Sequence, residues 1–202
     1  MKMSNYLSVA AVAMLATSLV PAEEVTHVQK IADQLCAACH GQDGNSTSSN
    51  YPKIAGQQAG YLEAQLLAFR DRTRSDKDAQ DVMWGWTRAL TNQDIKDLAA
   101  YYESQRPTAG EAKSEALMQK GAGIFQKGMT DKGIPACAAC HGAEAAGSAA
   151  APRLAGQHDR YLVRQLKAFR SMERPAAVAM HALVTNLSDQ DIGALAAYLQ
   201  AK

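Results

Sequence analysis

The stretch CAACH at residues 36–40 occurs a second time, letter for letter, at residues 137–141. Together the two copies contain all four cysteines of the 202-residue chain. On a helix, the Cys-x-x-Cys spacing places two sulfur atoms on one face, one turn apart, and the following histidine lies about one turn from the first cysteine. The two copies therefore predict two sites of the same chemistry.

This spacing is typical of covalent haem c attachment. The two thiols can bond the two vinyl groups at one edge of a porphyrin, while the imidazole reaches the iron from beneath the ring. We therefore predict two covalently bound haem c groups. The residues predicted to attach them are Cys36, Cys39, Cys137 and Cys140, and those predicted to bind iron are His40 and His141.

Three alternatives fit the repeated motif less well. A thioredoxin-like dithiol belongs in a βαβ context, which the sequence lacks. A zinc site built from both cysteine pairs would have roughly 15–20 residues between them, whereas 97 residues (137 − 39 − 1) separate Cys39 from Cys137. Two structural disulfides, each between adjacent turns of a helix, are the third alternative.

The repetition extends over the whole chain beyond its N-terminus. Identical segments are AGQ at 55–57 and 155–157, AFR at 68–70 and 168–170, QDI at 93–95 and 190–192, and LAAY at 98–101 and 195–198. Identities in this order, with two small gaps, indicate an internal duplication. We predict a signal peptide over 1–22, a first domain over 23–106, a linker over 107–114 with Pro107 and Gly110, and a second domain over 115–202.

Each half is predicted to be helical. Apolar residues recur at helical spacing before and after each cysteine motif; they are Val25, Val28, Ile31 and Leu35, then Leu62, Leu66 and Phe69, and in the second half Leu162, Leu166 and Phe169. The last helix of each half starts at a capping-box pattern, Thr91-x-x-Asp94 and Ser188-x-x-Asp191. Because no segment alternates with period two, we predict an all-α fold.

The second axial position of each iron decides between a carrier and a catalyst. A duplicated chemistry requires candidates in both halves, and Met83 and Met180 lie at equivalent positions, each seven residues before a matched leucine. His158 and His181 have no histidine counterpart in the first half. A lone methionine is usually a core residue, but two at matched positions indicate iron ligands. We predict His/Met ligation of both irons, which closes the site and raises its reduction potential.

The N-terminus is typical of an exported protein. Lys2 precedes an apolar run over residues 6–20, which Pro21 and Ala22 follow. This order is that of a secretory signal peptide, and the run is short for a membrane span, which needs about 20 apolar residues. We expect cleavage after Ala22; an uncleaved membrane anchor is the alternative. The net charge of +1 argues against nucleic acid as a partner.

These residues together resemble the dihaem cytochrome c4 family, in which two class I cytochrome c domains are fused. The resemblance rests on CAACHG twice, on YPKIAGQ at 51–57 and APRLAGQ at 151–157, on YLEAQLLAFR and YLVRQLKAFR, and on Met83 and Met180. It covers essentially all of the chain after the signal peptide. It implies that Pro52 and Pro152 each offer a carbonyl to the proximal histidine, and the loop at 127–136 departs from the first half.

The family resemblance implies a periplasmic electron carrier that is not an enzyme and is at most peripheral to the membrane. Its expected partners are redox proteins, with electrons passing from a quinol-oxidising complex to a terminal oxidase. The alternatives are the dihaem electron-accepting subunit of a dehydrogenase, such as flavocytochrome sulfide dehydrogenase, and a dihaem thiosulfate dehydrogenase or peroxidase. The role of four repeated polar residues stays open between haem propionate donors and ordinary surface or interface groups; they are Tyr61, Tyr161, Arg70 and Arg170.

Overall fold

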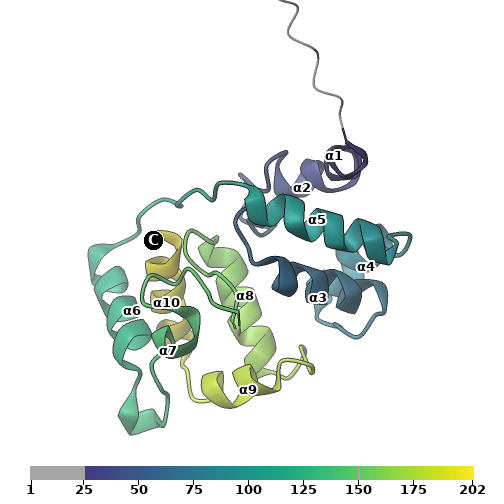
Figure 1. The fold of residues 1–202 in the computed structure, drawn as a ribbon. Helices are drawn as coiled ribbons and strands as arrows, with labels where there is room; N and C mark the ends of the chain where they lie inside the picture. The colour runs from purple at the N-terminus through teal and green to yellow at the C-terminus, as the bar shows by residue number, and fades with distance from the viewer. Residues whose placement is uncertain (1–25, 150) are drawn as a thin grey trace, which may run out of the picture.

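Two helical halves lie side by side and are joined by an extended segment, as Figure 1 shows. This computed structural model describes residues 26–149 and 151–202, so the predicted signal peptide and Val25 lie outside the described residues. In that part of the chain no β-sheet forms, and strand-like pairing is limited to the isolated bridges Met129–Ile134 and Ser148–Ala151. The prediction of an all-α fold is confirmed.

The first half has helices on both sides of its cysteine motif. Its elements in chain order are α1 (His27–Ile31), η1 (Ala32–Cys36), α2 (Ala37–His40), α3 (Ala59–Arg70), η2 (Ala79–Met83), α4 (Trp84–Thr87) and α5 (Asn92–Ser104). Both η1 and η2 are π-helical turns, and each ends at a residue predicted to belong to the haem site. Wide turns of this kind frequently occur at functional sites.

The second half repeats the arrangement, and its first helix is longer than that of the first half. Its elements are α6 (Glu115–Lys127), η3 (Thr130–Lys132), α7 (Ala138–His141), α8 (Asp159–Arg170), α9 (Val178–Val184) and α10 (Asp189–Gln200). The short segments η2 and α9, which carry the two predicted methionine ligands, were not predicted as helical. No helix in the described ranges has the length and apolar character that a membrane crossing requires.

The predicted helix starts are confirmed in both halves. Thr91 and Asp94 form a reciprocal capping box at the start of α5, and Ser188 and Asp191 form one at the start of α10. These two helices supply fully buried apolar residues to the two cores, Ile95 and Leu98 in the first and Ile192 and Leu195 in the second. Leu35, predicted on the apolar face of the first helix, is 37% exposed and lines the same cavity as Cys36 and His40.

The two capping aspartates have different surroundings. In the second half the buried Asp191 accepts ion pairs from Lys120 at 2.9 Å and Lys132 at 2.6 Å. Although burial alone raises the pKa of this carboxyl, the bonds from Lys132, Lys120 and Ser188 hold it well below the ordinary value. Besides its capping bonds with Thr91, Asp94 forms one ion pair, with the exposed His27 at 3.0 Å. Ion pairs therefore stabilise the contact between α6 and α10 more strongly than the contact between α1 and α5.

The interface between the halves is built from reciprocal hydrogen bonds. The Gln57 side chain accepts from the Arg153 amide at 2.8 Å and donates to its carbonyl at 3.0 Å. Gln157 accepts from the Lys53 amide at 2.9 Å and donates to its carbonyl at 2.7 Å. Because equivalent residues of the repeat exchange equivalent bonds, the halves are related by an approximate twofold axis.

The segment between the halves is held to both of them. The Lys53 ammonium donates to the carbonyls of Thr108 and Ala109, both at 3.0 Å. At the other end the Gly110 amide donates to the Gln200 carbonyl at 2.9 Å. The segment is therefore fastened to the first half near Thr108 and to the second half at α10.

Gly121 tests the packing of α6 on α10. A Cβ atom at this position would overlap the backbone carbonyl of Ala194, whereas a Cβ at Gly123 on the same helix would meet nothing within 4 Å. We expect Gly121→Ala to destabilise the second half by about 3 kcal/mol through overpacking. Gly123→Ala should leave it unchanged or stabilise it by up to about 1 kcal/mol. Thermal unfolding of both holoprotein variants checks this, and equal stabilities would contradict it.

The aspartate pair gives a prediction for pH. At neutral pH, Asp191→Asn should cost about 2 kcal/mol because two cations lose a buried partner, whereas Asp94→Asn should cost less than about 1 kcal/mol. A lowered folded-state pKa stabilises above the ordinary pKa of 3.8, and this contribution falls as the pH drops below that value. Denaturant unfolding at pH 7 and pH 3 measures the difference, which should shrink in acid. A gap between the variants that is unchanged at pH 3 would contradict the ion-pair explanation.

Candidate haem sites

The two predicted proximal histidines are buried and held in the same way. His40 and His141 are the last residues of α2 and α7, and their side chains are buried. In each, Nδ1 lies 2.8 Å from a proline carbonyl, that of Pro52 and that of Pro152 respectively. Because a carbonyl can only accept, Nδ1 carries the proton in both rings. The Nε2 lone pair is therefore free to bind a metal, as in sites where a second hydrogen bond orients the ligand.

Burial also sets the charge of these imidazoles. Desolvation lowers the pKa of His40 and of His141, and the bonds to Pro52 and Pro152 oppose this only in part. Both rings are therefore neutral at neutral pH. Neutral imidazole is the form that binds iron.

None of the four cysteines is in a disulfide. Burial raises the pKa of Cys36 and of Cys137, so both sulfur atoms remain neutral in apolar surroundings. The disulfide alternative has no support in these positions. Among the described residues, no group of three His, Cys, Asp or Glu side chains is placed to hold a metal ion, which is the arrangement that the zinc alternative would require.

A cavity of about 470 Å³ brings the predicted residues of the first site together. Cys36, Cys39, His40 and Met83 all line it. Its walls include many apolar side chains, among them Ile54, Leu62, Leu66, Phe69, Leu90 and Leu98. The volume lies within the range of about 300–1,000 Å³ that cofactor and ligand sites occupy.

The cavity crosses the boundary between the halves. Residues of the second half that line it include Pro152, Arg153, Leu154, Tyr161 and Leu162. In the second site, Met180 and Cys137 both pack against the core of that half, together with Leu166 and Phe169. Each predicted methionine therefore lies in the same apolar region as the cysteine motif of its own half.

Unpartnered polar atoms show what the site can bind. In the described part of the chain, three buried side-chain atoms lack a hydrogen-bond partner: Asp76 Oδ1, the Tyr102 hydroxyl and Arg153 Nε. Both Tyr102 and Arg153 line the cavity. The Tyr102 hydroxyl lies beside the Cys36 sulfur, whereas Arg153 Nε remains as a donor for an acidic group. An apolar wall with a few donors matches a porphyrin, which is flat and apolar and carries two carboxylates. The residues therefore fit a haem.

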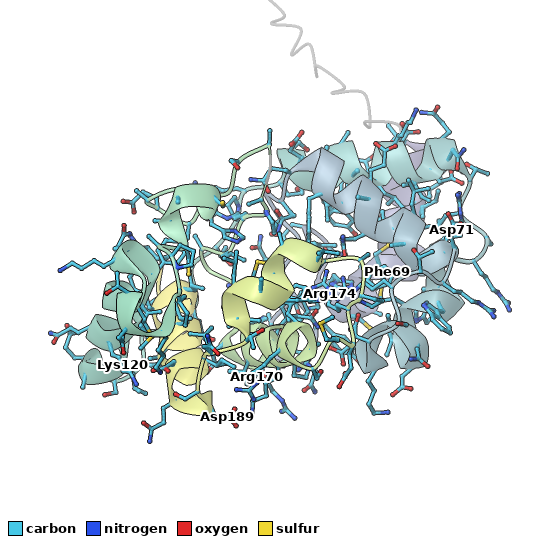
Figure 2. All side chains as sticks on the ribbon, turned by 90° about the horizontal axis from the view of Figure 1, so that it is seen from below. Phe69, Asp71, Lys120, Arg170, Arg174 and Asp189 are labelled. Atoms are coloured by element: carbon cyan, nitrogen blue, oxygen red, sulfur yellow. The ribbon has the colours of Figure 1, made fainter. Side chains whose placement is uncertain are left out.

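The four polar residues whose role was left open divide into two kinds. Tyr61 and Tyr161 line the cavity. Arg70 donates to the Leu90 carbonyl at 3.2 Å, and Arg170 donates to the Leu187 carbonyl at 2.8 Å. The arginines therefore tie the ends of α3 and α8 to the starts of the last helices, and Figure 2 shows Arg170 with Asp189 at the edge of the second half.

A buried polar cluster between the halves was not predicted. Arg74 and Arg174 are both buried and hydrogen-bonded to Gln65 and Gln165. The repeat itself could have indicated this cluster. Gln65 matches Gln165 and Arg74 matches Arg174 at the same offset of 100 residues that aligns the AGQ and AFR segments.

Comparison with known proteins identifies the family of the chain. The cytochrome c family model matches residues 25–106 and 118–201. The chain is 38% identical over 176 residues to cytochrome c4 of Azotobacter vinelandii, covering 82% of this chain and 83% of that protein. It is 33% identical over 174 residues to a thiosulfate dehydrogenase electron acceptor of Thiomonas intermedia, covering 83% and 78%. The structure of cytochrome c4 from Acidithiobacillus ferrooxidans matches with a TM-score of 0.78 at 35% identity, covering 83% of this chain and 98% of that one.

The size of the cavity predicts what happens when haem is not attached. Without a bound haem, the apolar side chains that line this cavity lose their packing partner, and the small first half keeps too little buried apolar surface to be stable. We expect the Cys36→Ser, Cys39→Ser double variant to lose cooperative unfolding of the first half while the second half keeps it. The matched double variant Cys137→Ser, Cys140→Ser should show the reverse. Hydrogen exchange resolved by segment measures this, and protection retained in a haem-free half would overturn it.

Proposed function

Because the chain belongs to the dihaem cytochrome c4 family, we propose that it carries single electrons between redox proteins of the periplasm, with His40 and Met83 binding one iron and His141 and Met180 the other. The general part of this function, a dihaem electron-transfer cytochrome, follows from the family. A haem c group bound in this way supplies one-electron transfer at its iron.

The observation that carries the ligand assignment is the matched placement of the two methionines. Met83 lines the same cavity as His40, and Met180 packs against the same core as Cys137. A thioether bound to the iron would occupy the position that a substrate would need. The same apolar walls keep water from the ligands, and the histidine on the other side is held by a proline carbonyl. These features support a carrier and not an enzyme.

The quinol-oxidising complex and the terminal oxidase are the proposed donor and acceptor. A second candidate is the electron acceptor of a dehydrogenase, and its support is the similarity to the thiosulfate dehydrogenase electron acceptor of Thiomonas intermedia. The two candidates differ in which protein reduces this chain. Rapid mixing with a quinol-oxidising complex and its quinol, and separately with a thiosulfate dehydrogenase and thiosulfate, compares the two rates directly.

A redox titration of the purified holoprotein tests the ligand assignment. We expect two one-electron steps at high potential and a ferric methionine-to-iron charge-transfer band from both haems. Met83→Leu and Met180→Leu should each remove one of the two contributions to this band, lower the potential of one haem, and let that haem bind added cyanide. A wild-type haem that is high-spin and lacks the band would contradict the assignment and favour a catalytic role.

A further inference from the structure

Two arginines and two glutamines form a closed hydrogen-bonded cluster between the halves. Within each half, Arg74 donates to Gln65 at 2.8 Å and Arg174 donates to Gln165 at 2.7 Å. Across the interface, Arg74 donates to Gln165 and Arg174 donates to Gln65, both at 2.9 Å. Each glutamine oxygen therefore accepts from both arginines. We refer to these four residues as the interdomain clasp.

Aromatic rings hold the guanidinium groups in place. Arg74 lies 4.6 Å from the centre of the Phe69 ring, and Arg174 lies 4.4 Å from that of Phe169. Figure 2 shows Arg174 in the middle of the molecule, between the two halves. Stacking on a ring fixes the plane of a guanidinium, so its donors point at the glutamines and not at solvent.

The backbone of each clasp arginine is bonded to the residue that follows a methionine ligand. Trp84, which follows Met83, donates its indole N–H to the Arg74 carbonyl at 2.9 Å. In the second half the ring nitrogen Nε2 of His181, which follows Met180, lies 2.7 Å from the Arg174 carbonyl. A carbonyl only accepts, so this nitrogen carries a hydrogen. Indole and imidazole thus make the same bond at equivalent places.

We infer that the interdomain clasp positions both distal methionines, with Trp84 and His181 as the positioning residues that connect each methionine segment to it. This inference rests on the proposed methionine ligation. The connection in the second half runs from Met180 through the His181 ring to the Arg174 backbone, and from its guanidinium to Gln65 of the first half. A change in the first half should therefore alter methionine binding at the second iron.

The clasp is not symmetric in charge. Arg74 also donates to the buried carboxylate of Asp76 at 2.7 Å. Burial alone lowers the pKa of Arg74, but Tyr161, Tyr61 and Asp76 raise it above the ordinary value, so this guanidinium stays charged. At the position equivalent to Asp76 the second half has Ala176. Among the described residues, no salt bridge is formed by Arg174.

This asymmetry predicts which haem depends more on the clasp. If a glutamine is removed, Arg74 keeps its buried ion pair with Asp76, which by itself fixes the arginine. Arg174 loses half of its side-chain acceptors. The methionine ligation at the second haem should therefore weaken in Gln65→Leu and in Gln165→Leu, while that at the first haem should change little.

Displacement of methionine by added imidazole measures the strength of ligation at each iron. In the wild-type holoprotein, the proton NMR signals of the two iron-bound methionine methyl groups report each haem separately, assigned with the Met83→Leu and Met180→Leu variants. We expect Gln65→Leu to raise the apparent affinity of imidazole for the second haem about fivefold, the factor that one hydrogen bond contributes. His181→Phe should do the same, and His181→Trp, which restores the donor used in the first half, should return the wild-type value.

Gln58→Leu is the matched control. Gln58 also makes amide hydrogen bonds across the interface, to the Ala146 carbonyl at 2.9 Å and from the Arg153 amide at 2.9 Å, but it does not contact the clasp. It should leave imidazole binding at both haems unchanged. Equal effects of Gln58→Leu and Gln65→Leu would overturn the inference. The interface would then stabilise both haem sites through domain contact in general and not through the clasp. A wild-type protein without the two methyl signals would instead refute the ligand assignment itself.

Discussion

In each half, one hydrogen bond joins the imidazole of the CAACH segment to a proline carbonyl 12 or 11 residues further along the chain. This bond fixes the ring tautomer and leaves Nε2 as the nitrogen that can bind a metal. It also fixes the residue that follows the proline. Lys53 and Arg153 then meet Gln157 and Gln57 through backbone hydrogen bonds across the interface. The proximal side of each haem site is thereby continuous with the contact between the halves.

The distal side reaches the same interface by another route. There the ring donors of Trp84 and His181 lead to the clasp arginines, whose guanidinium groups reach the opposite half. Each site is therefore held on both faces by a surface that it shares with its neighbour. Because the interface has approximate twofold symmetry, its glutamine–backbone and arginine–glutamine contacts each occur twice. One duplicated set of residues thus supports both sites. This arrangement explains why polar residues are buried between the halves of a chain whose cores are otherwise apolar.

The features of this structure that depend on a local sequence pattern or on matched repeats could be predicted from the sequence. The capping boxes, the helical character and the histidine–proline pairs were predicted correctly, because each follows from short-range spacing or from a family pattern. The π-helical turn that contains Leu35 was not predicted, because periodicity assumes a regular helix. Arg70 and Arg74 are equally plausible as donors in the sequence, and only the fold shows that one ties two helices together while the other enters the interface.

Some hydrogen bonds are kept in both halves although the residue that donates them differs. Where the first half has Trp84 the second has His181, and where the first has Gln58 the second has His158. Gln58 donates to the Ala146 carbonyl and His158 to the Ser46 carbonyl, so both replacements keep a side-chain N–H aimed at a carbonyl. A replacement of His181 without such a donor would have left the buried Arg174 carbonyl unsatisfied, at a cost of about 1–3 kcal/mol. Asp76 and Ala176 are the contrasting pair, where the bond itself is absent from the second half. The two halves thus share their hydrogen-bond geometry while differing in charge, and a difference in charge around equivalent geometry is what can make two chemically identical haem sites behave differently.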